Sequence, residues 1–219
     1  TIAYSGLATG ISITGEANIR AVSDIRVTGI DLDNAENGAV EQYAPKYTKN
    51  TITNGIKLPN SNSSISYTIE ITNKGDIDQA IYGLSTVSNN NGLHILIDGE
   101  EINTKLPLII PYRTSREITI TYTTSTPSNE AINIVNTFDF REVYYITYET
   151  NGGSNIQRQI KYQNVDINLT SERPTKTKYV FTGWTDEQNG TQVKYAPGDL
   201  YTLNQNKTLY AIYRQGEAT

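Results

Sequence analysis

His94 is the only histidine in the 219-residue chain, and it is the first residue to test for catalytic chemistry. Most acyl-transfer triads use a histidine as the general base. His94 alternates with Leu93 and Ile95 in a segment with strand periodicity, so its side chain is expected to face solvent. No serine stands in the Gly-x-Ser-x-Gly context that exposes a nucleophile. We therefore interpret His94 as an ordinary strand histidine.

Carboxylates form two adjacent pairs, Glu100-Glu101 and Asp186-Glu187, and each pair lies beside a turn signal. Two carboxylates that flank a scissile bond can hydrolyse a glycoside. Neighbouring side chains on a strand point to opposite faces, however, so an adjacent pair does not share one site. We interpret both pairs as solvated turn charges and predict no catalytic residue.

An acidic, oxygen-rich stretch from Asp31 to Gly38 has the composition of a calcium loop. Calcium takes six to eight oxygen ligands, and an EF-hand loop needs an oxygen at position five and glycine at position six. Those positions hold Ala35 and Glu36, so the pattern fails, although a looser structural Ca²⁺ site stays an alternative. With no cysteine, P-loop or dinucleotide fingerprint, the chain is predicted to hold no metal and no cofactor.

The tyrosines are the remaining residues with binding chemistry, and the chain has 16 of them. Aromatic faces suit the apolar faces of sugars and of protein surfaces. Tyr43, Tyr47 and Tyr112 stand in sequence contexts typical of loops. They are our candidates for exposed contact residues.

Composition narrows the class of partner. The 18 Lys and Arg against 23 Asp and Glu give a net charge of −5, which argues against a nucleic-acid or anionic-membrane partner. No run approaches the roughly 18 apolar residues that span a bilayer, so no membrane insertion is predicted. The absence of cysteine excludes disulfides and argues against an extracellular protein of animal origin. The absence of methionine, even at position 1, indicates a mature fragment or a trimmed chain.

Apolar and polar residues alternate from Ile11 through most of the first 142 residues, most clearly from Ile65 to Thr72. Period-two alternation indicates strands with one buried and one solvated face, and Gly29 is a predicted bulge. Turn signals separate the strands at Asn37-Gly38, Asn54-Gly55, Lys74-Gly75-Asp76, Asn91-Gly92 and Asp98-Gly99. This spacing predicts an all-β sandwich without helices, with its last strand at residues 131–140.

The segment from Ile65 to Asp76 reads ISYTIEITNKGD. It resembles the signature of immunoglobulin-like repeats in bacterial surface proteins, in which an aromatic-rich strand ends in a TNxGD turn. The resemblance covers one hairpin, and it implies an immunoglobulin-like sandwich over residues 10–142.

A second unit is predicted at residues 143–214. It contains in order TYETNGGS at 147–154, Pro174-Thr175, FTGW at 181–184, Pro197-Gly198-Asp199 and TLYA at 208–211. These elements resemble one Listeria–Bacteroides repeat, also called the internalin B-repeat. The resemblance implies a small β-grasp-like domain that serves as a repeat or spacer in a secreted or surface-attached bacterial protein. Lys178 stands where the family usually has Gly, and Tyr213 where it usually ends in Trp.

Two side chains are best interpreted within these units. Trp184 belongs to the repeat signature, so we expect it in the core rather than in a sugar-stacking platform. Asn136 is in phase with the apolar residues of its strand and should point inward, where a Lys–Asn isopeptide crosslink would need a lysine and a buried acid. Lys57 and Glu70 are out of phase with their apolar neighbours, so no crosslink is predicted.

The sequence therefore predicts a mostly β chain, with an immunoglobulin-like sandwich followed by a small β-grasp-like domain. We expect a non-catalytic module of an extracellular bacterial protein, at the cell surface or cell wall of a Gram-positive bacterium. Its expected role is adhesin-like or that of a spacer, with an unknown protein or glycan partner. The alternative is a carbohydrate-binding module, which needs exposed aromatics in a row or groove. An enzyme would need a deep pocket with convergent carboxylates around His94.

Overall fold

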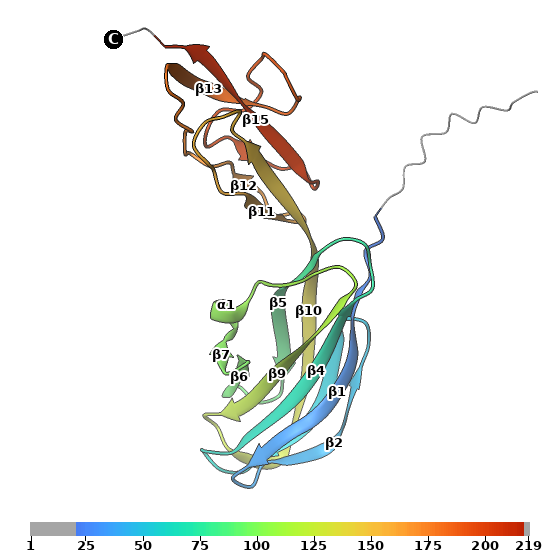
Figure 1. Ribbon diagram of the computed structural model, residues 1–219. Helices are drawn as coiled ribbons and strands as arrows, with labels where there is room; N and C mark the ends of the chain where they lie inside the picture. Colours follow the sequence, from blue (N-terminus) through green and yellow to red (C-terminus); the bar gives the residue numbers. More distant parts are fainter. Residues whose placement is uncertain (1–20, 217–219) are drawn as a thin grey trace, which may run out of the picture.

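The computed structural model describes residues 21–216, and nearly all of its regular structure is β (Figure 1). This confirms the mostly β prediction. The predicted strand at Ile11 lies outside the described residues. The elements in the first 124 residues are β1 (Ile25–Glu36), β2 (Val40–Tyr47), β3 (Thr51–Leu58), β4 (Ser64–Asn73), β5 (Gln79–Ser88), β6 (Leu93–Ile97), β7 (Glu100–Glu101), α1 (Ile102–Lys105), β8 (Leu108–Ile110) and β9 (Thr114–Thr124). The later elements are β10 (Ser128–Glu149), β11 (Gln159–Tyr162), β12 (Ile167–Asn168), β13 (Tyr179–Thr185), β14 (Leu200–Tyr201) and β15 (Lys207–Gln215).

Residues 21–142 form two antiparallel sheets that pack face to face, and we call this unit the sandwich. One sheet has the order β1-β4-β9-β6-β7. The other has the order β2-β3-β10-β5-β8, in which β10 pairs with β3 on one side and β5 on the other. The predicted bulge at Gly29 is confirmed, because the register between β1 and β4 shifts between Val27 and Gly29.

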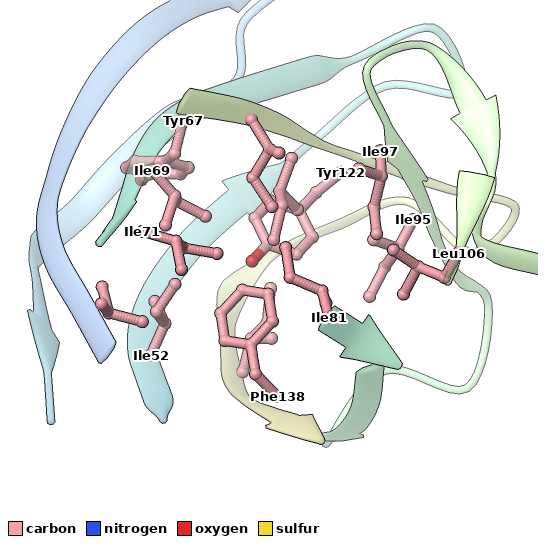
Figure 2. Packing of buried hydrophobic residues seen from close by; sticks show 14 of the residues in the cluster. Ile52, Tyr67, Ile69, Ile71, Ile81, Ile95, Ile97, Leu106, Tyr122 and Phe138 are labelled. Carbon is pink, nitrogen blue, oxygen red and sulfur yellow. The ribbon is translucent and has the colours of Figure 1, made fainter. Parts of the chain in front are cut away.

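The sandwich core lies between the two sheets and consists mainly of isoleucine (Figure 2). Alternate residues of β4 and β9 point inward from one sheet, and alternate residues of β3 and β10 point inward from the other. Branched side chains at every second position suit this pleated, buried surface. The alternation in the sequence therefore has its cause in the burial of one face of each strand.

A series of hydrogen-bonded polar side chains crosses this core. Asn136 is fully buried, as its phase predicted. Its amide donates to the Tyr122 hydroxyl, and its carbonyl accepts a 2.6 Å hydrogen bond from Thr86. Burial raises the pKa of Tyr122 far above its usual value, so this phenol stays a neutral hydrogen-bonding group. These hydrogen bonds join β9 of one sheet to β10 and β5 of the other.

The predicted turn at Asn54-Gly55 is wrong, because both residues are buried inside β3. Asn-Gly is a strong local turn signal, but a contact from another strand overrides it here. The ring of Tyr43 lies so close to Gly55 that a Cβ atom there would be 2.0 Å from Tyr43 Cε1. By contrast, Asn37-Gly38 does form a turn, with φ of 53° and 80°.

Three other details differ from the sequence predictions. Residues 102–105 form a short helix, α1, where no helix was predicted. The acidic stretch from Asp31 to Glu36 belongs to β1 and is not a loop. The last strand of the sandwich, predicted at 131–140, extends over the 22 residues of β10.

Residues 143–216 form the C-terminal unit. Its sheet has the order β13-β15-β10-β11, in which β10 and β15 are parallel and the other pairs antiparallel. Its described residues contain no helix, and the β-grasp-like assignment stays a prediction. The core centres on the fully buried Trp184, which confirms its predicted place.

Candidate functional site

The three candidate contact tyrosines lie at separate places in the sandwich. All are exposed, with 40% exposure for Tyr43, 46% for Tyr47 and 55% for Tyr112. Tyr43 and Tyr47 belong to β2, so their predicted loop context is wrong, whereas Tyr112 lies in the turn between β8 and β9. Their contact role stays a prediction.

Tyr43 is held flat on the sheet. Its ring covers Gly55 of β3, and its hydroxyl donates a 2.9 Å hydrogen bond to the Asn133 side chain of β10. Tyr47 is also fixed, because its hydroxyl donates to the Thr28 carbonyl at 2.9 Å. Both rings therefore have structural contacts that account for their positions.

His94 is exposed, as predicted, and its Nε2 lies 3.0 Å from Glu101 Oε1. The two side chains line an open pocket of about 380 Å³ together with Asn103, Thr86 and apolar residues. The Thr86 hydroxyl is committed to Asn136, and no serine lines the pocket. The arrangement therefore places a base and its carboxylate partner at the surface without an activated nucleophile beside them.

The other carboxylates do not gather into a centre. Within residues 21–216 no group of three or more His, Asp or Glu side chains could hold a metal ion. Asp186 is not the solvated turn charge that the sequence predicted, because its side chain is only 11% exposed. Its Oδ2 accepts hydrogen bonds from Lys194 at 2.6 Å and Lys207 at 3.1 Å. These contacts, with Lys194 first, hold the pKa of Asp186 below its usual value.

Four loops meet at the end of the sandwich that lies farthest from the C-terminal unit (Figure 1). We call residues 37–39, 59–63, 89–92 and 125–127 the distal loops. Their sequence is rich in Asn, Ser and Thr and carries no Lys, Arg, Asp or Glu. Turn signals predicted some of these loops, but the sequence did not show that they come together.

Asparagine side chains fix the distal loops in pairs. Asn60 donates to the Asn37 carbonyl at 2.8 Å, and Asn37 donates to the Asn62 carbonyl at 2.9 Å, which ties loop 37–39 to loop 59–63. Asn90 donates to the Thr126 carbonyl at 3.0 Å, and its Oδ1 accepts from the Thr126 hydroxyl at 2.9 Å. The second pair of bonds ties loop 89–92 to loop 125–127. The distal loops are therefore preorganised and polar.

The opposite end of the sandwich is the junction with the C-terminal unit. The 22 residues of β10 pass from one unit to the other without interruption (Figure 1). Arg141 lies 4.1 Å from the centre of the Tyr82 ring, and its guanidinium donates to the Gln163 carbonyl at 3.3 Å. The Tyr82 ring also packs against Tyr162 of the C-terminal unit at 5.3 Å. The junction is therefore made by a shared strand and by side chains from both units.

A phenol and a carboxylate close the other side of the junction. The Tyr145 hydroxyl in the C-terminal unit donates a 2.7 Å hydrogen bond to Asp78 of the sandwich. Burial and this carboxylate raise the pKa of Tyr145 to about 12. The Val143 amide donates to the Asp78 carbonyl at 2.9 Å, so Asp78 binds the C-terminal unit through backbone and side chain.

The chain also enters the sandwich at this junction. Residues 22–24 run beside residues 74–76, where the Lys74 amide donates to Asp24 and the Asp76 amide donates to Val22. The chain leaves through β10 beside Asp78. Entry and exit therefore lie at the same end of the sandwich, and the distal loops lie at the other (Figure 1).

The C-terminal unit is built around aromatic contacts and left-handed turns. Trp184 packs against Tyr148 at 4.8 Å and against Phe181 at 4.9 Å between ring centres. The turn before β13 places Lys178 at a φ of 66°, in the left-handed region that glycine adopts without strain. Tyr213 packs on Phe181, and its hydroxyl donates to the Thr150 carbonyl at 2.8 Å.

Residues 144–212 match the family model of the Listeria–Bacteroides repeat domain. The match covers about a third of the chain. No curated protein matches the chain. No solved structure matches it either.

The two departures from the usual repeat sequence lie in the turn before β13 and in β15. Lys178 occupies a backbone conformation that favours glycine, which is the residue the family usually has there. Tyr213, one residue beyond the matched segment, packs on Phe181 and donates a hydrogen bond to the Thr150 carbonyl.

The repeat domain is found in bacterial surface and secreted proteins, and the match supports a non-catalytic surface module. No helix within residues 21–216 is long and apolar enough to cross a membrane. The immunoglobulin-like assignment of the sandwich stays a prediction.

Proposed function

We propose that the chain is an adhesin-like module of a bacterial cell-surface protein, in which the sandwich presents its distal loops to a protein or glycan partner. The observation that carries this proposal is that the chain enters and leaves the sandwich at the same end. Residues 22–24 and β10 both meet the sandwich at the junction, so both connections lie at the end opposite to the distal loops. A spacer in line with its neighbours would pass the chain from one end to the other.

The junction supports presentation in a fixed direction. Two units joined by a flexible linker would point in many directions, and ordering them on binding costs free energy. Here β10 is continuous, and Tyr82, Arg141 and Asp78 of the sandwich contact the repeat. The repeat therefore acts as the base that sets the direction of the sandwich.

The distal loops have the properties of a preorganised contact surface. Loops on a rigid scaffold are frequent sites of recognition, and Asn, Ser and Gly supply hydrogen bonds that adapt to a partner. The exposed side chains of Asn62 and Asn91 in the distal loops, and of Asn129 beside them at the start of β10, make no hydrogen bond within the described residues. These three side chains are available to a partner, whereas Asn37, Asn60, Asn89 and Asn90 hold the loops in place.

The test is binding of the full chain to immobilised matrix proteins and glycans. The variant carries Asn62→Lys, Asn91→Lys and Asn129→Lys, and the matched control places three lysines on the repeat at Asn155, Gln157 and Thr202. We expect saturable binding that the first variant weakens at least tenfold, because three new charges disturb a surface that has none. The control should bind like the parent chain.

Two results would contradict the proposal. Equal weakening by both variants would indicate a nonspecific charge effect. Loss of binding in the repeat control alone would place the contact surface on the repeat and make the sandwich its support.

A further inference from the structure

A pocket of about 390 Å³ opens at the junction, between the end of the sandwich and the repeat. Its volume falls within the range of small-molecule sites, which often form where two units meet. The polar side chains that line it are Ser23, Lys49, Asn50, Gln79, Asp139 and Gln163. Gln163 belongs to the repeat and the others to the sandwich, so residues of both units line the pocket.

Three primary amides face this pocket, from Asn50, Gln79 and Gln163. An amide offers both hydrogen-bond donors and an acceptor, which matches the hydroxyl groups of a sugar. Each amide is held in position: Gln79 is buried and donates a 2.7 Å hydrogen bond to Ser23, and Asn50 donates to the Phe138 carbonyl at 3.4 Å. The side-chain oxygen of Gln163 accepts a 3.5 Å hydrogen bond from the Glu142 backbone amide, and the backbone amide of Gln163 donates to the Glu142 carbonyl at 2.9 Å.

An aromatic wall completes the pocket. Phe138 and Phe140 stack with ring centres 5.6 Å apart and an angle of 7° between their planes. Phe138 is buried in the core, and the half-buried Phe140 presents apolar surface to the pocket. A sugar ring places its C–H groups against such a surface while its hydroxyls reach the amides.

The charges of the pocket are not balanced. Asp139 is already paired, because its carboxylate accepts hydrogen bonds from Arg141 at 2.8 Å and 3.1 Å. Lys49 makes no ion pair with any described residue, so its ammonium is the free charge at the pocket. The pocket therefore favours a ligand that carries one negative charge.

We propose that the junction pocket binds one acidic sugar unit of the hexuronate type. Its carboxylate pairs with Lys49, its hydroxyls bind Asn50, Gln79 and Gln163, and its ring packs on Phe140. This site is separate from the distal loops, and the proposal does not depend on what they contact. Because the ligand bridges the two units, it also stabilises their docked arrangement.

The test uses methyl β-glucuronide and methyl β-glucoside as probes of the full chain, by chemical-shift titration and saturation-transfer NMR. We expect saturable shifts at residues around the pocket, with tighter binding of the glucuronide. Lys49→Gln should weaken the glucuronide about threefold to fivefold and leave the glucoside unchanged, as expected for a partly exposed ion pair. Gln163→Ala should weaken both sugars by a similar factor through a lost hydrogen bond.

Lys57→Gln is the matched control, because it removes one positive charge at the other end of the sandwich. It should leave both affinities unchanged, and all three variants should keep the parent melting temperature. The proposal fails if neither sugar gives saturable shifts at the pocket, or if Lys49→Gln leaves the preference for the glucuronide intact. Binding that Gln163→Ala does not affect would place the sugar elsewhere and also overturn it.

Discussion

The sandwich and the repeat share one strand but are stabilised in different ways. Fourteen of the 20 buried residues in the sandwich core are isoleucine, and they come from most of its strands. The repeat core has nine buried residues, of which four are aromatic: Tyr148, Phe181, Trp184 and Tyr201. The apolar contacts of the sandwich are spread over many similar side chains, whereas those of the repeat concentrate on one indole.

The turns show the same contrast. Four of the seven non-glycine residues with positive φ lie in the repeat, at Asn151, Asn164, Lys178 and Asn189. Two of the six strands that enter its sheets, β12 and β14, contain only two residues each. A unit with short strands depends on specific turn conformations and on a central aromatic contact. The sandwich instead depends mainly on alternation along its long strands, since seven of its ten strands have eight residues or more.

The largest expected effect is therefore at Trp184. Trp184→Ala removes a fully buried indole that contacts both Tyr148 and Phe181, and such changes cost about 3–5 kcal/mol. A unit of this size has a stability of roughly 4–10 kcal/mol, so we expect the repeat to unfold partly or wholly. Hydrogen exchange by NMR should show lost protection in β13 and β15 and retained protection in β4 and β9.

The matched variant is Ile120→Val, which trims one methyl group from the distributed core of the sandwich. It should cost about 0.5–1.5 kcal/mol and leave protection in both units. Loss of protection throughout the sandwich in Trp184→Ala would show that β10 makes the two cores one cooperative unit. The sandwich core and the repeat core would then not be stabilised independently.

The contrast also explains what the sequence could predict. The alternation of apolar and polar residues predicted the strand from Ile65 to Thr72 and the burial of Asn136 in the core. It could do so because successive side chains of a strand point to opposite faces, one buried and one solvated. The predicted turn at Asn54-Gly55 was wrong because the Tyr43 ring that covers Gly55 comes from β2, and a local turn signal contains no information on that contact. The same phase also runs through β10, where Ile134, Phe138 and Ile146 are all buried. The continuity of β10 was thus present as a signal, although the predicted boundary at 142 interrupted it.

The candidate sites were less predictable than the strands. Asparagine and glycine marked the distal loops as turns, but strand order decides which turns meet, and strand order depends on long-range pairing. The junction pocket joins Lys49 and Gln163, which lie more than 100 residues apart in the sequence. No spacing rule connects two such residues. Only the pairing of β10 with strands of both units brings them together.

A second prediction asks whether the sandwich also depends on single contacts outside its core. In Gly55→Ala the new methyl group would lie 2.0 Å from the Tyr43 ring, so the ring must move and lose its bond to Asn133. We expect a cost of about 1–3 kcal/mol in urea unfolding. In a Tyr43→Ala background the same change should be neutral or stabilising, because glycine is unfavourable inside a strand by roughly 0.5–1 kcal/mol.

The double-mutant cycle separates the ring contact from the effect of glycine alone. An equal cost of Gly55→Ala in both backgrounds would show that Tyr43 moves aside freely. Tyr43 would then be a mobile exposed ring and a better contact residue than its packing suggests.

The smallest expected effect is the acid sensitivity of the repeat at Asp186. Lys194 and Lys207 both donate to its carboxylate, and they lower its pKa in the folded state. A depressed pKa means that the stabilisation is fully present above the ordinary value of 3.8 and is lost as pH falls below it. We expect a contribution of up to about 1 kcal/mol, since both lysines are partly exposed. Trp184, the one tryptophan of the chain, reports unfolding of the repeat by its fluorescence.

Denaturant unfolding from about pH 6 to about pH 3 should therefore show a steeper loss of repeat stability in the parent chain than in Asp186→Asn. The matched control is Glu172→Gln, which removes an exposed carboxylate that makes no ion pair with a described residue. Its pH profile should follow that of the parent chain. Identical profiles for Asp186→Asn and the parent chain would show that the two lysines do not stabilise the repeat. Its stability would then rest on the Trp184 core and the turns alone.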